Sequence, residues 1–155
     1  MRRLLLGTIS LLYAAAVILI TIFPIRPHPA SYWAGEPFSG MVHWIPGDVD
    51  APSFVLNVIM LLPFGVLGPL LSRRCDGYGP IAWRAATASA AIELTQLVLG
   101  LTLGSRRTID VNDLVANTAG ALLGLLILRL AVPARAHRAR LAGVTPADPA
   151  PRGGS

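Results

Sequence analysis

Four apolar stretches separated by polar segments dominate this chain: residues 4–23, 54–71, 83–103 and 114–132. Each is long enough for an α-helix to cross a hydrocarbon core of about 30 Å, which takes about 20 residues. Pro63 and Gly65 interrupt the second stretch, but a membrane helix tolerates them where neighbouring helices satisfy the freed backbone groups. The pattern predicts an all-α fold, a polytopic membrane bundle of four transmembrane helices.

The segments around these stretches predict the domain organisation. Arg2 and Arg3 before the first stretch resemble the start of a secretory signal, but the stretch ends at Pro24 without a small-residue cleavage site, so we expect a retained helix. Residues 24–53 show no regular period. Residues 133–155 hold few large apolar side chains, which is typical of disorder. We predict a transmembrane domain over residues 1–132 and a basic, disordered cytoplasmic tail over residues 133–155.

The distribution of charge predicts an orientation and argues against a nucleic-acid partner. The net charge is +5, but the 13 cationic residues are all arginines and lie at the ends of the apolar stretches, not along one polar face. At 54% hydrophobic and 14% charged, the composition is also unlike that of a soluble domain. Positive residues favour the cytoplasmic side. We therefore expect a multi-pass protein of the bacterial inner membrane with both termini in the cytoplasm, three arginines outside (positions 26, 106, 107) and ten inside (2, 3, 73, 74, 84, 129, 135, 138, 140, 152).

Polar residues within the apolar stretches are the strongest functional signal. A carboxyl group at the depth of Glu93 costs roughly 2.5 to 3.5 kcal/mol, so it requires a compensating interaction. Ser89, Glu93, Gln96 and Gly100 follow spacings of four, three and four, which place them on one helix face toward the bundle interior. Asn57 lies about one turn into the second stretch. The spans thus offer polar groups at related depths.

The segment between the third and fourth stretches mixes cations with acids. Arg106 and Arg107 depart from the positive-inside bias, and Asp110, Asp113 and Asn117 follow at spacings that share one face. In a structural interpretation, the arginines pair with nearby carboxylates and an aspartate serves as the anion at a helix N-terminus. In a functional one, the arginines bind phosphate or carboxylate bidentately, and the carboxylates position them or move protons. The sequence leaves both interpretations open.

Small residues in the fourth stretch predict close helix packing. Ala116, Gly120 and Gly124 recur at four-residue spacing, which lets another helix approach closely. We favour packing within the bundle over a dimer interface, and the sequence predicts no oligomeric state.

The sequence indicates no metal or cofactor. Cys75 is the single cysteine, so neither a disulfide within the chain nor a paired-cysteine zinc site can form. His28 and His43 could be combined with Asp48 or Asp50, but their spacing matches no known ligand pattern. We therefore expect plain loop residues at these positions.

Taken together, these polar motifs resemble the VanZ-like family. They comprise Asn57 with Pro63-Phe64-Gly65, then Glu93-Leu94-Thr95-Gln96, the segment from Arg106 to Asp113, and Asn117-Thr118-Ala119-Gly120. The resemblance runs over residues 54–128 and implies a bacterial membrane protein of four or five spans. The family's namesake is linked to resistance to teicoplanin, a lipoglycopeptide antibiotic, but the resemblance implies no known reaction. The matching positions are Asn57, Glu93, Gln96, Arg107, Asp110, Asp113, Asn117 and Gly120, with Arg106 as a neighbour.

Three functions follow as hypotheses. We favour the binding of membrane lipids, either an anionic lipid or a lipid-linked cell-wall precursor, in an outward-facing pocket of Glu93, Arg107, Asp110 and Asp113, with a link to glycopeptide tolerance. A membrane enzyme acting on a lipid or lipid-linked glycan would use Glu93 or Asp113 as acid or base, but the sequence offers no obvious nucleophile. A structural or partner-binding module would close the same charges into an internal network.

Overall fold

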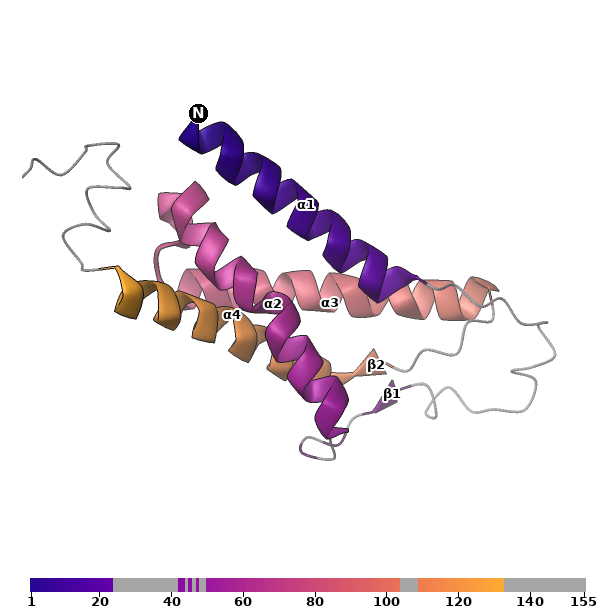
Figure 1. Cartoon of the computed structure of the whole chain (residues 1–155). Helices are drawn as coiled ribbons and strands as arrows, with labels where there is room; N and C mark the ends of the chain where they lie inside the picture. The colour runs from indigo at the N-terminus through magenta and orange to yellow at the C-terminus, as the bar shows by residue number, and fades with distance from the viewer. Residues whose placement is uncertain (24–41, 44, 46, 48–49, 104–108, 133–155) are drawn as a thin grey trace, which may run out of the picture.

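The protein is a bundle of four long helices. The computed structural model describes residues 1–23, 42–43, 45, 47, 50–103 and 109–132. Its helices are α1 (Arg2–Ile22), α2 (Ala51–Leu71), α3 (Tyr78–Leu103) and α4 (Val111–Ala131), shown in Figure 1. All four are long and apolar enough to cross a membrane. The prediction of an all-α bundle with four membrane-spanning helices is confirmed.

Three of the helices begin three to five residues earlier than the apolar stretches, and two of these, α2 and α4, begin after a capping aspartate. Asp50 precedes α2 and accepts a hydrogen bond from the Ser53 backbone N–H at 3.1 Å. Asp110 does the same for α4. Such caps satisfy backbone donors that have no partner within the helix. Hydropathy identifies only the part of a helix that lies in hydrocarbon. The starts predicted from hydropathy therefore lie after the first residues of these helices.

Helices α2 and α4 form the closest contact in the bundle, and α2 crosses α4 in Figure 1. Glycines make this contact backbone to backbone. A Cβ atom on Gly120 would overlap the carbonyl oxygen of Val58, and one on Gly124 would overlap that of Leu62. From the other side, a Cβ on Gly65 would overlap the Ala121 carbonyl. The small residues of α4 therefore pack within the chain, against α2.

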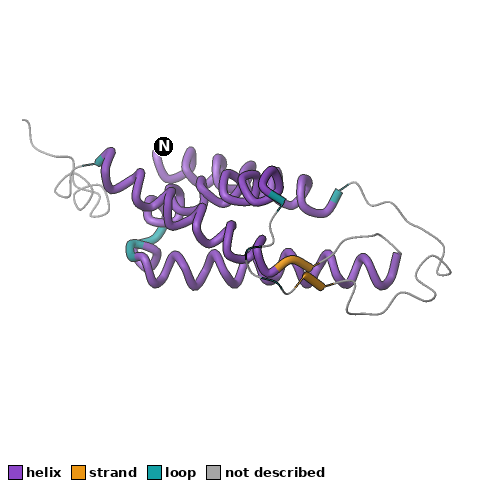
Figure 2. The backbone as a smooth tube through the Cα atoms, turned by 90° about the horizontal axis from the view of Figure 1, so that it is seen from below, coloured by secondary structure: helices purple, strands orange, loops and turns teal. Residues whose placement is uncertain are grey.

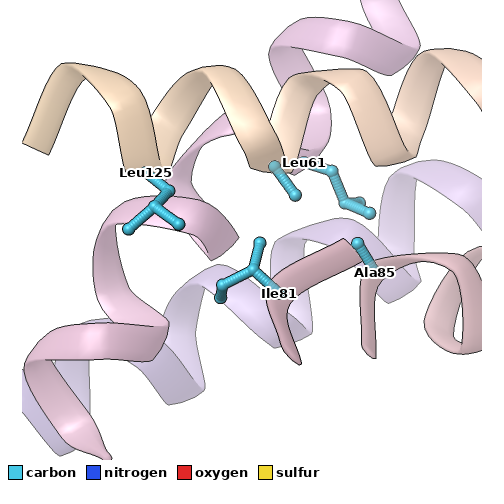
Figure 3. Packing of buried hydrophobic residues seen from close by; sticks show 5 residues of the cluster. Leu61, Ile81, Ala85 and Leu125 are labelled. Atoms are coloured by element: carbon cyan, nitrogen blue, oxygen red, sulfur yellow. The ribbon is translucent and has the colours of Figure 1, made fainter. Parts of the chain in front are cut away.

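A small apolar core lies where α2, α3 and α4 meet. It consists of Leu61 from α2, Ile81 and Ala85 from α3, and Ala121 and Leu125 from α4 (Figure 3). This core lies toward the short turn that joins α2 to α3, which includes the 3-10 helix η3 (Arg73–Cys75). We call this end of the bundle the turn end. Most other large apolar side chains face outward, as expected for a protein surrounded by lipid.

At the turn end, Arg129 near the end of α4 is tied to the α2–α3 connection. Its guanidinium lies 3.7 Å from the Asp76 carboxylate and 4.4 Å from the centre of the Tyr78 ring. A cation in the last turn of a helix also complements the helix dipole. These contacts fix the C-terminal end of α4 beside the start of α3.

At the opposite end, two very short strands join the first loop to the start of α4. Strand β1 (Val42–His43) pairs in parallel with β2 (Ile109–Asp110), with Val42 opposite Ile109 and His43 opposite Asp110 (Figure 2). The sequence had given no regular element in this loop. We call this end of the bundle the strand end.

The glycine contact between α2 and α4 yields a stability prediction. Gly120→Ala places a methyl group against the Val58 backbone, which cannot move as a flexible side chain can, so we expect a loss of about 1–3 kcal/mol. The measurement is the midpoint of unfolding in mixed detergent. Gly7→Ala in α1 is the control, because no atom lies within 4 Å of the added Cβ. Equal midpoints for the two variants would contradict the contact.

Candidate functional site

Polar side chains from α2, α3 and α4 gather at the strand end. We call this group the polar cluster, and its four best-buried members, Ser89, Glu93, Asn112 and Asn117, each expose 7% or less of their surface. The remaining three are half-buried. The full set is Asn57, Ser89, Glu93, Asp110, Asn112, Asp113 and Asn117.

A hydrogen bond between α3 and α4 sets the depth at which the cluster begins. Asn117 donates its Nδ2 to the Ser89 hydroxyl oxygen at 2.8 Å, and both residues are almost fully buried. One turn farther toward the strand end, α3 carries Glu93 and the antiparallel α4 carries Asp113. These two carboxyl groups therefore lie at a similar level on facing helices. The Asn57 side chain of α2 hydrogen-bonds to Asp113, which brings in the third helix.

Glu93 is positioned at the start of α4. Its Oε2 accepts a hydrogen bond from the Asp110 backbone N–H at 3.3 Å. Asp110 is the N-cap residue of α4, so Glu93 supplies from another helix the acceptor that a capping-box glutamate supplies within its own. The partial positive charge at a helix N-terminus also favours a nearby carboxylate. These interactions compensate part of the cost of placing Glu93 in the membrane.

Asn112 bridges the first loop to α4. Its Nδ2 donates to the Ile45 carbonyl at 3.1 Å and to Asp110 Oδ1 at 2.9 Å, and its Oδ1 accepts from the Gly47 N–H at 3.0 Å. Gly47 has a φ of 94°, a backbone conformation that favours glycine. Asn112 lay within the family motif, yet the sequence analysis did not select it. The one signal in the sequence that could have identified Asn112 is its amide side chain, two residues after an aspartate that could cap a helix.

Asp110 acts as a helix cap. Its Oδ1 accepts from the Asn112 backbone N–H at 2.8 Å, and Asp113 is the acidic residue in the first turn of α4. The structural interpretation therefore holds for the aspartate that caps the helix. Its other part, pairing with Arg106 or Arg107, lies outside the described residues.

Gln96 has a different neighbour from Glu93, although one predicted face carried both. Its Nε2 donates to the Thr21 carbonyl of α1 at 2.8 Å. The predicted stripe on α3 therefore divides, with Ser89 and Glu93 toward α4 and Gln96 toward α1. Helix periodicity assigns a face but not which neighbour it meets.

The residues of the hypothetical metal site are mostly outside the described part of the chain. His28 and Asp48 lie outside it, as does the side chain of His43, and Asp50 caps α2. Among the described residues, no three His, Cys, Asp or Glu side chains are grouped to hold a metal ion.

A comparison with protein-family models matches the VanZ/LLP1 family over residues 10–132. The chain belongs to this family. The match is wider than residues 54–128, because it takes in most of α1 and the first loop. Comparisons of the chain with curated proteins and with solved structures found no match.

This VanZ/LLP1 protein brings together most of the positions on which the resemblance was based. Asn57, Glu93, Asp110, Asp113 and Asn117 all belong to the polar cluster at the meeting of three helices. Chemically, the cluster offers carboxylate and amide oxygens that can orient guanidinium groups or accept hydrogen bonds. The Oδ1 atom of Asn117 is buried and has no hydrogen-bond partner among the described residues.

The Asn112 bridge gives a prediction for the first loop. Asn112→Ala removes the acceptor of the Gly47 N–H, and an opening free energy lowered by about 1 kcal/mol should speed amide exchange at Gly47 about fivefold. Hydrogen exchange with mass spectrometry measures this. Thr102→Ala is the control, because its hydroxyl bonds only to its own helix at Val98. An unchanged Gly47 rate would show that the bridge is not formed in the membrane.

The buried pair between α3 and α4 gives a second prediction. A double-mutant cycle of Ser89→Ala and Asn117→Leu should return a coupling energy of about 0.6 kcal/mol, the average for hydrogen bonds between membrane helices. Unfolding in mixed detergent provides the four free energies. A coupling near zero would mean that the two side chains contribute independently.

Proposed function

We propose that this protein binds an anionic lipid or a lipid-linked cell-wall precursor at its strand end, in the bacterial cytoplasmic membrane with both termini in the cytoplasm. The supporting observation is the polar cluster itself. Glu93 is buried within a membrane-spanning helix, and its carboxylate accepts a hydrogen bond from the Asp110 backbone N–H at the start of α4. Asp110 in turn lies three residues after Arg107 in the chain. Buried carboxyl groups are costly in a membrane, and proteins that retain them usually use them.

The chemistry of the neighbouring segment favours a phosphate group as the ligand. In the chain, Thr108 alone separates Arg106 and Arg107 from β2, and three peptide links keep the Cα atoms of Arg107 and Asp110 within about 11 Å. Guanidinium groups bind phosphate bidentately, and adjacent carboxylates hold them in orientation. The cluster carboxylates Glu93, Asp110 and Asp113 are suited to that orienting role.

The asymmetry of the two ends supports the proposed orientation. Arg73, Arg74, Arg84 and Arg129 all belong to the turn end. Trp83 near this end exposes 75% of its surface, as is typical of aromatic residues at the headgroup level. Because arginines favour the cytoplasmic side, the strand end would face outward. A cell-wall precursor held there would be less accessible to a glycopeptide antibiotic, so tolerance is the phenotype we expect from overexpression.

A structural module is the second candidate, and a specific observation favours it. The bonds of Glu93 to the Asp110 N–H, and of Asn112 to Ile45 and Gly47, all satisfy backbone groups of the protein itself. If the cluster only holds the helices and the loop together, substitutions should lower the folded yield without changing the lipids that copurify.

Lipid analysis of the purified protein tests the proposal. The full chain is extracted in native membrane patches, and its lipids are identified by mass spectrometry. We expect enrichment of an anionic or polyprenyl lipid, and its loss in Arg107→Ala, because the phosphate loses its bidentate partner. We expect affinity to fall about tenfold or more, which corresponds to roughly 1.4 kcal/mol or more and is near the lower end of the range for hydrogen bonds to charged groups.

Arg74→Ala is the matched control. It removes the same charge from an exposed side chain at the turn end, and the hydrogen bond to Arg84 uses only its backbone carbonyl. Comparison is made at equal folded yield. The proposal would be refuted if the lipids bound to the unsubstituted protein matched those of the bulk membrane, or if both variants lost the enriched lipid equally. Either result would favour the structural module.

A further inference from the structure

Helix α1 is held more loosely than the rest of the bundle. Only 6% of its membrane-spanning window is buried, against 39% for α4. Leu4, Leu11 and Ile20 each expose more than two thirds of their surface. In a membrane, lipid covers these side chains, but lipid tails are as apolar as leucine, so no hydrophobic force holds α1 against the other helices.

Between residues that the structure describes, two side-chain hydrogen bonds link α1 to its neighbours. Tyr13 donates its hydroxyl to the Met60 carbonyl of α2 at 2.7 Å. Gln96 of α3 donates to the Thr21 carbonyl at 2.8 Å. Thr21 is the penultimate residue of α1, where carbonyl groups lack a partner within the helix, so Gln96 supplies a donor that the helix cannot. Both attachments use a single side chain and can break without disturbing the backbone of either helix.

The position of Gln96 connects α1 to the polar cluster. Gln96 lies three residues after Glu93 on α3, about one helical turn away, and α1 reaches α3 near its own C-terminal end (Figure 1). Moving this end of α1 away would uncover the side of α3 next to Glu93. The contact between α2 and α4, in contrast, consists of glycine against backbone and cannot open without losing its packing.

We propose that α1 is a lateral gate, through which a membrane lipid reaches the polar cluster from within the bilayer. This inference rests on the proposed lipid-binding function and adds the route of the ligand. A lipid that enters sideways keeps its hydrocarbon chains in the membrane while its headgroup approaches the strand end, where the carboxylates of the polar cluster orient the arginines. The route explains why the helix beside the cluster is the one with the weakest attachment.

Lipid exchange tests the gate directly. The full chain in nanodiscs is loaded with isotopically labelled phosphatidylglycerol or polyprenyl phosphate, and replacement by unlabelled lipid is followed by mass spectrometry. Tyr13→Phe removes only the hydroxyl that bonds to Met60, so exchange should be about threefold faster, the equivalent of an average hydrogen bond between membrane helices. Tyr78→Phe is the matched control, since it makes the same change at the turn end and should leave exchange unchanged.

A locked form provides the opposite result. Tyr13→Cys and Met60→Cys, in a Cys75→Ala background, are joined by a bis-thiosulfonate reagent, which forms a disulfide with each thiol. Because Tyr13 contacts the Met60 backbone, the spacer is chosen long enough to reach the side chain at position 60. Exchange should stop until these disulfides are reduced. Single-cysteine variants treated with the same reagent are the controls. Exchange equally fast in the linked and reduced forms, with labelled lipid still bound, would overturn the gate and leave the proposed function intact. Absence of bound lipid in the unsubstituted protein would overturn both.

Discussion

The direct contact between the backbones of α2 and α4 is the constraint on which the rest of this structure depends. Between helices in a membrane there is no hydrophobic driving force, so association relies on close packing and on hydrogen bonds. Gly65, Gly120 and Gly124 permit that packing, because a side chain at any of them would overlap a carbonyl group. The same contact brings α2 to the polar cluster. Val58 rests on Gly120, and the adjacent Asn57 is thereby brought to Asp113.

The polar cluster combines support of the fold with the chemistry of a candidate site. Glu93 meets a backbone N–H at the start of α4, and Asn112 meets both a carbonyl and an N–H of the first loop. The bond of Glu93, which lies within a membrane-spanning helix, replaces an interaction with water that is unavailable inside a membrane. Because the same side chains maintain the architecture and would orient the arginines, a change in binding is informative only when the folded yield is measured alongside it.

The bundle is also uneven in how firmly its parts are joined. Helices α2, α3 and α4 share an apolar core at the turn end and the polar cluster at the strand end. Helix α1 is attached at its side by Tyr13 and near its end by Gln96. Three closely packed helices beside a fourth with less buried surface form an arrangement that can open toward lipid without disrupting the site.

The number of membrane-spanning helices could be predicted from the amino-acid sequence, because the length and apolar composition of each helix follow from the thickness of the hydrocarbon core. The sequence also indicated an aspartate, Asp110 or Asp113, at the N-terminus of the fourth helix, since capping depends on neighbours in the chain, and its spaced polar residues indicated the family. The partner of each polar residue, in contrast, could be read only from the packed helices. Gln96 and Glu93 shared one predicted face, but such a face spans about 100° and can meet two helices, so Gln96 meets α1 while Glu93 meets α4. The roles of Asn112 and Tyr13 depend on atoms 47 or more residues away in the chain. Local periodicity carries no information about such distant contacts, which arise only when the helices pack.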